Sequence, residues 1–514
     1  MAGISATERK AGGWLFLVLA AAVLAAVFTG ERSASAAPTC TTVCYVDAAT
    51  GSDANDGATP GTALKTIQAG LDAVSAGGEV RVAAGTYAEN LVVSTPLTLR
   101  GAGQGSTIVI PAISDPNCGG SGGGSICAGS SNVILVAASN VTIEDLTVDG
   151  DNPSLVSAYN VGGANLDARN GIITNHLLGT FNDLEVANVT VRNIYLRGIY
   201  ASSGGTFNIH DNTVTNVQAE YASIAMFNWI GSGTFANNTV SWANDAISAN
   251  HSSGTTFVGN VVTHSGSGIH TDNAGDGGGS ADLISGNSVT ACKPDGYGIW
   301  TFVQYLAATV EDNIVSGCAV GLGAFGGGFS GPTVTTTFAG NAVTGDGGAG
   351  SIGALIQTGT WGYGNTAVAA DFEGNTIVGF ETGVYVDDSD DPYAGGNTSG
   401  PTAAVTLHRN AISGNGAGVS NNGAVAVNAQ CNWFGAVSGP SGVGPGLGDS
   451  VSGNVAYSPW LLAAGPLETA PCGVPVVPVS QQQCKNGGWK FAIRANQTSF
   501  KNQGDCVSYT KNGK

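Results

Sequence analysis

Carboxylates and a histidine lie beside short aliphatic strands in the middle of the chain. Asp245 stands just before one such strand, and His270 and Asp272 lie within the next. Two carboxylates across one glycosidic bond can act as acid and as base or nucleophile, and a histidine can carry the proton. We therefore predict Asp245, Asp272 and His270 as catalytic residues, with Glu220 and Asp295 in nearby turns. The competing interpretation is that these acids cap turns.

Aromatic and amide side chains recur in the same strands. Side chains of a strand alternate between its two faces, so if the Ile and Val positions point inward their neighbours point outward. Sugar rings stack on aromatic faces, and polar groups bond their hydroxyls. The pattern predicts a polysaccharide groove, while packing of the same rings under loops is the alternative. The predicted substrate-binding residues are Tyr200, Phe227, Asn250, Trp300, Phe302 and Tyr385.

Two further kinds of charge bear on the chemistry. Dense carboxylates suit a hard cation, so Ca²⁺ is a candidate cofactor, and no organic cofactor is expected. A lyase acting on a uronate needs a base and a cation, but Arg197 and Lys293 are the nearest cations and neither falls on an outward strand position. The predicted calcium ligands are Asp387, Asp388, Asp390 and Asp391.

Composition limits the fold and the partners. The chain has 514 residues, of which 80 are glycine and only 10% are charged. Helical folds with large surfaces need many Lys, Glu and Arg, so a mainly helical protein is disfavoured. Lys and Arg number 17 against 36 Asp and Glu, which gives a net charge of −19. Such a chain lacks the basic surface that nucleic acid requires.

An internal repeat explains the glycine. Asn followed by a residue and then Val or Ile recurs at steps of 22 to 35 residues, with a Gly-rich turn and a second strand after it. Stacked rungs of short strands would pair each strand with its counterpart one rung on and bury one continuous core. Asn suits the bend, because it tolerates a left-handed backbone and its amide can bond along a ladder. The series is Asn212, Asn238, Asn260, Asn287, Asn313, Asn341, Asn375 and Asn410, with Asn140 and Asn188 assigned to it earlier in the chain.

The two ends of this repeat carry more specific motifs. Tyr45-Val46-Asp47 and Gly85-Thr86-Tyr87 near the start, and Asn432-Trp433-Phe434-Gly435 near the end, resemble segments of bacterial right-handed parallel β-helix proteins of the pectate-lyase-like superfamily. The resemblance implies an all-β, right-handed, single-stranded solenoid over about Tyr45 to Leu461. It does not imply one activity, since lyases, hydrolases, epimerases, adhesins and inert surface proteins share this solenoid. Near its start, an amphipathic segment over 64–74 predicts a capping helix.

The remaining segments predict export. Residues 1–36 are predicted to be a signal peptide, because cations precede an apolar run and a small-residue cleavage site. Residues 37–465 form the β-helix domain, 466–483 a Pro-rich linker and 484–514 a small C-terminal module. An even set of ten cysteines in an exported chain predicts disulfides. Neighbour pairing gives Cys40–Cys44, Cys118–Cys127, Cys292–Cys318, Cys431–Cys472 and Cys484–Cys506.

These features predict a secreted, extracellular carbohydrate-binding protein, with catalysis as a further hypothesis. Its expected partner is a polysaccharide or a cell-surface glycan, bound and cleaved by a hydrolase or lyase mechanism. A non-catalytic surface or matrix protein, whose solenoid is a spacer or an adhesive surface, is the alternative. We expect a monomer that binds no nucleic acid and has no membrane span once the signal is removed.

Overall fold

The computed structural model describes residues 40–118, 124–127, 129–272, 279–302, 305–327, 333–359, 366–388 and 402–513. The predicted signal peptide lies outside these residues. Within them, no helix is both long and apolar enough to cross a membrane.

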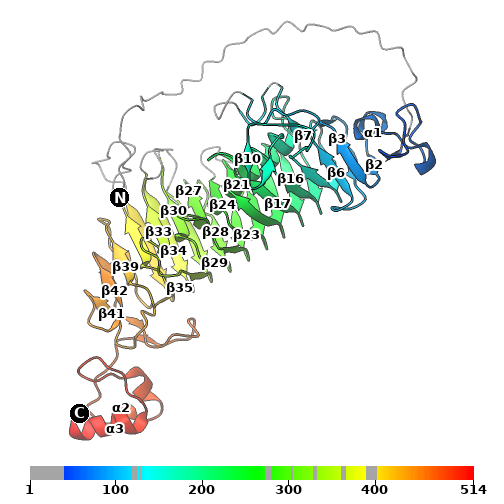
Figure 1. Cartoon of the computed structure of the whole chain (residues 1–514). Coiled ribbons are helices and arrows are strands. Elements are labelled where there is room, and N and C mark those ends of the chain that lie inside the picture. The colour runs from blue at the N-terminus through cyan, green and yellow to red at the C-terminus, as the bar shows by residue number, and fades with distance from the viewer. Residues whose placement is uncertain are drawn as a thin grey trace, which may run out of the picture. The chain divides into compact units, whose positions relative to one another are not determined.

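Three parallel sheets of stacked short strands make up most of the fold (Figure 1). Over residues 78–421, apart from one inserted pair of short strands, consecutive strands belong to different sheets, so each of these rungs contributes one strand to each sheet before the chain begins the next rung. We name the sheets in the order in which a rung visits them.

Sheet 1 has 15 strands: β1 (Val43–Val46), β2 (Gly78–Val82), β5 (Leu97–Arg100), β8 (Val141–Glu144), β13 (Leu184–Ala187), β16 (Thr206–His210), β19 (Ser232–Ala236), β22 (Thr255–Val258), β25 (Leu283–Ser285), β28 (Thr309–Glu311), β31 (Thr335–Ala339), β34 (Val368–Glu373), β37 (Ala403–His408), β40 (Val427–Asn428) and β43 (Val455–Ala456). Sheet 2 has 12: β3 (Gly85–Ala88), β6 (Thr107–Ile110), β9 (Thr147–Asp149), β14 (Thr190–Arg192), β17 (Thr213–Val217), β20 (Thr239–Ala243), β23 (Val261–Thr263), β26 (Ser288–Thr290), β29 (Ile314–Ser316), β32 (Ala342–Thr344), β35 (Thr376–Val378) and β38 (Ala411–Ile412). Sheet 3 has 14: β4 (Leu91–Val93), β7 (Asn132–Val136), β12 (Asn170–Thr174), β15 (Arg197–Ser203), β18 (Ile224–Trp229), β21 (Asp245–Asn250), β24 (Ser267–Asp272), β27 (Tyr297–Phe302), β30 (Val320–Phe325), β33 (Ile352–Gln357), β36 (Thr382–Asp387), β39 (Ala417–Asn421), β42 (Gly448–Ser452) and β41 (Pro440–Gly442).

The stacking register puts like residues on like. In sheet 2, Val214 pairs with Val240 and Val240 with Val262, and all three side chains are fully buried. One hydrophobic cluster runs through the rungs, as a solenoid requires, because a single rung cannot bury its own inner face. The predicted parallel β-helix is confirmed.

A ladder of buried asparagines follows the turn from sheet 1 to sheet 2. Each Nδ2 donates to the Oδ1 of the next rung's asparagine at 2.9–3.0 Å, from Asn212 through to Asn432. The same Nδ2 also donates to a backbone carbonyl of an earlier rung, as Asn260 does to Phe235. The predicted amide ladder is confirmed, and it extends one rung beyond the predicted series.

The left-handed bend falls one residue earlier than predicted. The residue before each ladder asparagine carries the positive φ, for example Asp211 at 57° and Gly286 at 64°. Asn188 holds this bend position at 52°, while the buried Val189 takes the ladder position. Asn140 precedes β8 of sheet 1. Neither belongs to the ladder, because the short sequence motif does not distinguish a bend asparagine from a buried one.

The two ends of the solenoid differ from its middle. The capping helix α1 (Ile67–Ala73) is shorter than the predicted 64–74 segment, because the Thr66 side chain caps it at Ala69 N. A short 3-10 helix η1 (Pro60–Thr62) precedes it, and Leu64 instead bridges to Val46. Further along the chain, the antiparallel pair β10 (Asn160–Val161) and β11 (Ala164–Asn165) is an insertion within one rung, between β9 and β12.

The C-terminal region holds the remaining elements. The Pro-rich segment is tied back by the antiparallel pair β44 (Trp460–Leu461) and β45 (Cys472–Gly473) and by the Cys431–Cys472 disulfide. The module contains α2 (Gln481–Cys484), η2 (Gly488–Phe491) and α3 (Gln503–Asn512), with Cys484–Cys506 in its small core. All five predicted disulfides form, and no cysteine is left free.

Replacing Asn287 with alanine is expected to lower the free energy of unfolding by about 3 kcal/mol, because its neighbours lose hydrogen-bond partners inside the core. Asn287 Oδ1 accepts from both the N and the Nδ2 of Asn260, and its own Nδ2 donates to Asn313. Urea unfolding followed by circular dichroism measures the change. Asn208→Ala, on the exposed side of β16, is the control and should change stability by less than about 0.5 kcal/mol. Equal changes in the two variants would contradict the ladder's role.

Candidate functional site

The outer surface of sheet 3, which we call the sheet 3 face, carries ladders of side chains. One column runs through Arg197, Ile224, Asp245, Ser267 and Tyr297. A second column runs through Tyr200, Phe227, Ser248, His270 and Trp300. At the far ends of the strands, Trp229 pairs with Asn250 and Asp272 pairs with Phe302.

The aromatic residues of this face form two clusters. Tyr200 and Phe227 pack with Ile173 and Ile224, and are 4% and 5% exposed. The second cluster consists of Trp300, Phe302, Val320, Phe325 and Leu355.

The burial of these rings corrects one prediction. Trp300 and Phe302 are each 8% exposed, so with Tyr200 and Phe227 they do not line an open groove. Rings on neighbouring rungs are about 4.8 Å apart, close enough to cover one another. Tyr385 and Asn250 are half-buried.

A polar patch lies between the two aromatic clusters, and it brings Asp245 and His270 together. His270 Nδ1 is 3.3 Å from Asp245 Oδ1. The imidazole stacks on Trp300, with centroids 4.0 Å apart and planes at 15°, and the indole N–H donates to Ser267 Oγ. His270 is buried, and only 16% of the Asp245 side chain is exposed. Both facing atoms are buried and neither makes a hydrogen bond, so the pair is close but its hydrogen-bonding capacity is unused.

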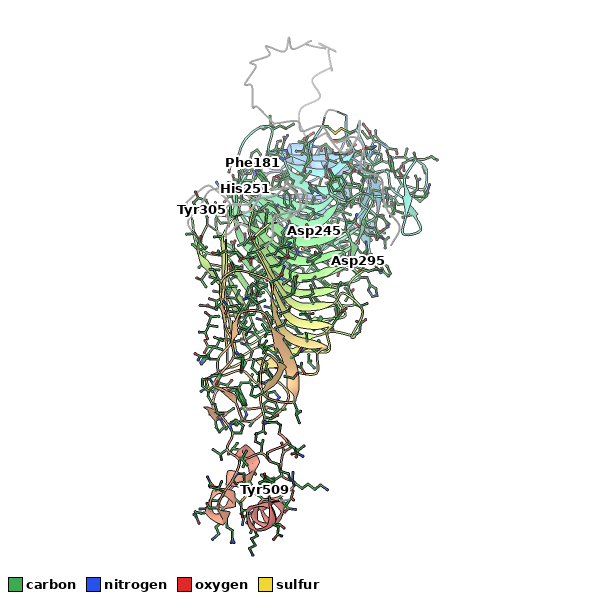
Figure 2. All side chains as sticks on the ribbon, turned by 90° about the vertical axis from the view of Figure 1, so that its left-hand side faces the viewer. Phe181, Asp245, His251, Asp295, Tyr305 and Tyr509 are labelled. Atoms are coloured by element: carbon green, nitrogen blue, oxygen red, sulfur yellow. A yellow bond between two sulfur atoms is a disulfide. The ribbon has the colours of Figure 1, made fainter. Side chains whose placement is uncertain are left out.

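Asp272 lies elsewhere on the face. Asp245 pairs with Ser267, so Asp272 is five residues further along the neighbouring strand, which is roughly 15 Å. Its Oδ1 accepts from the backbone N–H of His251, the residue after β21. Figure 2 shows Asp245 and His251 apart across this face. The predicted Asp245–Asp272 pair is therefore too far apart to straddle one glycosidic bond.

Arg197 also lies on this face, contrary to the prediction. Strict alternation back from Ile199 would turn it inward, but two successive positions face the core. A Cβ at Gly198 would meet the core residue Val214 at 2.9 Å, and Ile199 is fully buried. The same double inward step places Asp245 outward. Aligning the strands on Ile199 and Ile247 would have revealed this shared column.

The surroundings of Arg197 perturb its charge. Its guanidinium lies 4.9 Å over the Phe227 ring, and Nη1 donates to the carbonyl of Ala222. Burial lowers the pKa of Arg197 to about 10, while the nearby Tyr200 and Asp245 favour the charged form. The Nε atom is buried and makes no hydrogen bond.

A second carboxylate, Glu220, lies in the turn before β18. The Tyr195 hydroxyl is 3.4 Å from Glu220 Oε2, and Oε1 is buried without a hydrogen bond. Burial raises the pKa of Tyr195 to about 12, and the Glu220 carboxylate adds to the rise. Glu220 also contributes to the electrostatic surroundings of Arg197, as Asp245 does. Perturbed, incompletely paired groups of this kind concentrate at functional sites.

The other cation, Lys293, is engaged in a turn. Its Nζ donates to Gln218 Oε1 at 2.7 Å and to Asn244 Oδ1 at 3.1 Å, and burial lowers its pKa. Asn244 in turn donates through Nδ2 to the Glu220 carbonyl. Lys293 therefore fixes the turn that leads into Asp245.

The predicted calcium site is only partly described. Asp390 and Asp391 lie outside the described residues. Asp388 Oδ2 accepts from the N–H of Ala424, and Asn422 donates to Asp387 Oδ1. The described part of the chain holds no group of three or more His, Cys, Asp or Glu that could bind a metal. Calcium binding stays a prediction.

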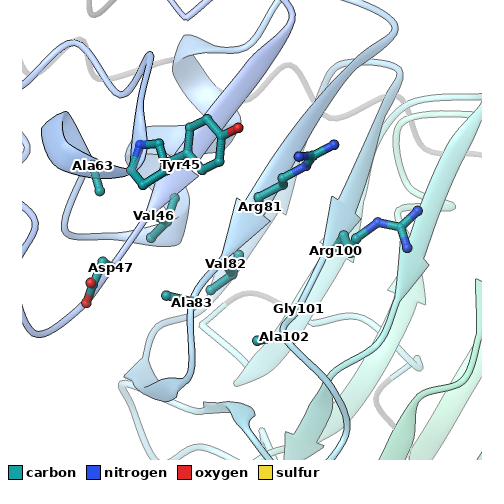
Figure 3. Close-up of a pocket in the computed structure, with 11 residues that line it drawn as sticks. Tyr45, Val46, Asp47, Ala63, Arg81, Val82, Ala83, Arg100, Gly101 and Ala102 are labelled. Carbon is teal, nitrogen blue, oxygen red and sulfur yellow. The ribbon is translucent and has the colours of Figure 1, made fainter.

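A cavity of about 270 Å³ lies at the other end of the solenoid, over β1, β2 and β5 (Figure 3). Tyr45, Arg81 and Arg100 line it. Both arginines are bound by Glu79, at 2.9 Å each, and Arg100 also pairs with Glu144 and Asp145, so both cations already have carboxylate partners. We therefore assign no chemistry to this cavity.

Residues 170–343 match the family model described as the right handed beta helix region. Together with the sheet topology, this match makes the solenoid a right-handed parallel β-helix. No curated protein matches the chain.

Several solved structures are similar to this chain. The A-module of the mannuronan C-5 epimerase AlgE6 from Azotobacter vinelandii is 17% identical, with 76% of this chain and 94% of that one covered and a TM-score of 0.46. The polygalacturonase from Erwinia carotovora ssp. carotovora is 12% identical, with 70% and 100% covered and a TM-score of 0.45. The catalytic unit of the GH87 α-1,3-glucanase from Streptomyces thermodiastaticus strain HF3-3 is 15% identical, with 79% and 68% covered and a TM-score of 0.46.

Trp300→Ala is expected to lower the free energy of unfolding by about 3 kcal/mol, because it empties a buried site beneath the aromatic cluster and beside His270. The thermal midpoint and urea unfolding measure this change. Tyr385→Ala, at a half-buried position of the same column, should cost less. An unchanged thermal midpoint for Trp300→Ala would mean that the ring is accessible, as the open-groove prediction required.

Proposed function

We propose that this right-handed parallel β-helix binds a polysaccharide at the sheet 3 face and hydrolyses it by acid–base catalysis at Asp245. The observation that carries the proposal is the Asp245–His270 pair, 3.3 Å apart and without a hydrogen bond between the facing atoms. A carboxylate beside an imidazole can hold a proton and release it to a departing glycosidic oxygen.

Hydrolysis needs a second group that activates water or attacks the sugar. Glu220 supports this role better than Asp272, because Glu220 shares the electrostatic surroundings of Arg197 with Asp245. Its Oε1 is buried and makes no hydrogen bond, so this oxygen keeps its capacity to accept one. In this proposal Asp245, backed by His270, protonates the leaving oxygen, and Glu220 acts on the opposite side of the bond.

The cations favour hydrolysis over elimination. A β-elimination at a uronate requires a cation free to neutralise the sugar carboxylate. Arg197 donates to the Ala222 carbonyl and lies over Phe227, and Lys293 is held by Gln218 and Asn244. A net charge of −19 also repels a polyanionic chain.

A non-catalytic surface or matrix protein is the second candidate. It is favoured by the burial of His270 and of four aromatic rings that would otherwise contact a glycan. The five disulfides fit an oxidising compartment, extracellular or periplasmic, for either candidate. We also propose that the protein is secreted, as the predicted signal peptide indicates, and that it is a monomer, as we expect from the sequence.

Asp245→Asn and His270→Gln are each expected to slow polysaccharide cleavage by about 10²- to 10⁴-fold while binding is retained, because each removes a proton-transfer group and preserves shape. Release of reducing ends from a panel of polysaccharides, with and without calcium, measures the rate.

Asp272→Asn is the matched control, since it lies on the same face and its Oδ1 can still accept from His251. Its rate should stay within a few-fold of the wild type. A wild type that binds glycans but cleaves none would favour the matrix protein. If Asp272→Asn cleaves as slowly as Asp245→Asn, the result would contradict this proposal and support the Asp245–Asp272 catalytic pair predicted from the sequence.

A further inference from the structure

Two exposed aromatic rings stack at the turn from sheet 2 to sheet 3. Trp242 is the last residue but one of β20, and His264 is the first residue after β23. The strand register places the two residues at matching positions on consecutive rungs. Their ring centroids are 4.5 Å apart, with the planes at 14°. Trp242 is 48% exposed and His264 is also exposed. Unlike the rings of the sheet 3 face, this pair is accessible to a large ligand.

The backbone at these positions does not suit such residues. Trp242 has φ of 56° and His264 has φ of 53°, in the left-handed region. A bulky side chain is an outlier there, and the neighbouring rungs use smaller residues at the same turn. Those residues are Asn193, Asn216, Ala291, Gly317 and Gly379, which all share the left-handed backbone. A strained tryptophan that stays half-exposed gains little from burial in return, so the strain points to function rather than folding.

The stacked pair is close to the proposed catalytic group. Trp242 precedes Asp245 by three residues, which sets their Cα atoms at most about 10 Å apart. Between them lies Asn244, whose side chain bonds both Lys293 and the Glu220 carbonyl. A sugar ring stacked on Trp242 would therefore lie close to a glycosidic bond placed at Asp245.

A shallow groove lies along the same turns further along the solenoid, beginning at Cys292 on the rung after His264. Beyond His264 the turn positions become alanine and glycine, and two hollows of about 430 Å³ and 810 Å³ open over them. The hollows share Asp346 and Ala349, so they form one continuous groove. Asp295 and Glu381 line its two parts, with Lys293 as the one cation among the lining residues.

We propose that Trp242 and His264 form a stacking platform for one sugar ring, and that the groove beyond takes further units of a neutral or amino-sugar polysaccharide. Pyranose rings present apolar faces to an aromatic ring, and the carboxylates of the groove accept from hydroxyls or pair with ammonium groups. The same carboxylates repel uronates. This platform rests on the proposed function, whose substrate class it narrows.

Trp242→Asn tests the platform, because asparagine tolerates the left-handed backbone while the ring is lost. Affinity for soluble chitosan or laminarin, measured by titration calorimetry, is expected to fall about tenfold or more. Trp242→Phe keeps a ring and should stay within about threefold of the wild type. The thermal midpoint of Trp242→Asn should be equal or higher, since the substitution relieves strain. Leu178→Asn, an exposed apolar residue in another loop, is the control and should bind as the wild type does.

The outcomes separate this platform from the proposed function. A wild type that binds no polysaccharide overturns both. A wild type that binds and cleaves chitosan or laminarin, with Trp242→Asn binding equally well, overturns the platform alone. Binding of polygalacturonate in place of chitosan and laminarin overturns the substrate class. Weaker polysaccharide binding by Trp242→Asn, with Trp242→Phe and Leu178→Asn binding nearly as the wild type does, supports the platform.

Discussion

A buried amide in a solenoid has no water to bond, so it must find its partner on the next rung. The asparagine ladder meets this constraint from Asn212 to Asn432, with each amide donating to the next side chain and to a backbone carbonyl. Because every member is both donor and acceptor, one slipped rung would leave its neighbours unsatisfied. The ladder therefore fixes the register of sheets 1 and 2, and the short turns carry that register to sheet 3.

Register is what assembles the candidate site. Asp245 and His270 meet because their strands are neighbours and their side chains lean toward each other from adjacent columns of one face. Asp272 is only two residues from His270, but it is the last residue of β24, whereas Asp245 pairs with Ser267, the first residue of that strand. Which polar groups can act together thus depends on their positions along the stacked rungs. It does not depend on how far apart they lie in the sequence.

The aromatic residues show two different solutions to exposed apolar area. On the sheet 3 face, rings on successive rungs cover one another, so Trp300 stabilises the fold and holds the imidazole of His270. At the sheet 2 to sheet 3 turn, Trp242 and His264 stack but stay exposed, because the next rungs offer only alanine and glycine beside them. The aromatic residues that strand alternation predicts to be exposed are therefore buried, whereas the exposed pair, Trp242 and His264, lies at a turn that the strand pattern does not cover.

The sequence by itself determined the solenoid, the amide ladder and the five disulfides. These depend on spacing and on local residue type, which repeat along the chain and can be counted. The outward position of Arg197, the separation of Asp245 from Asp272 and the burial of Trp300 were decided only by the tertiary structure. Two successive core-facing residues, such as Gly198 and Ile199, break the strict alternation on which the strand prediction relied. Exposure of a ring depends on what stacks above and below it, and those neighbours are 20 to 35 residues away in sequence.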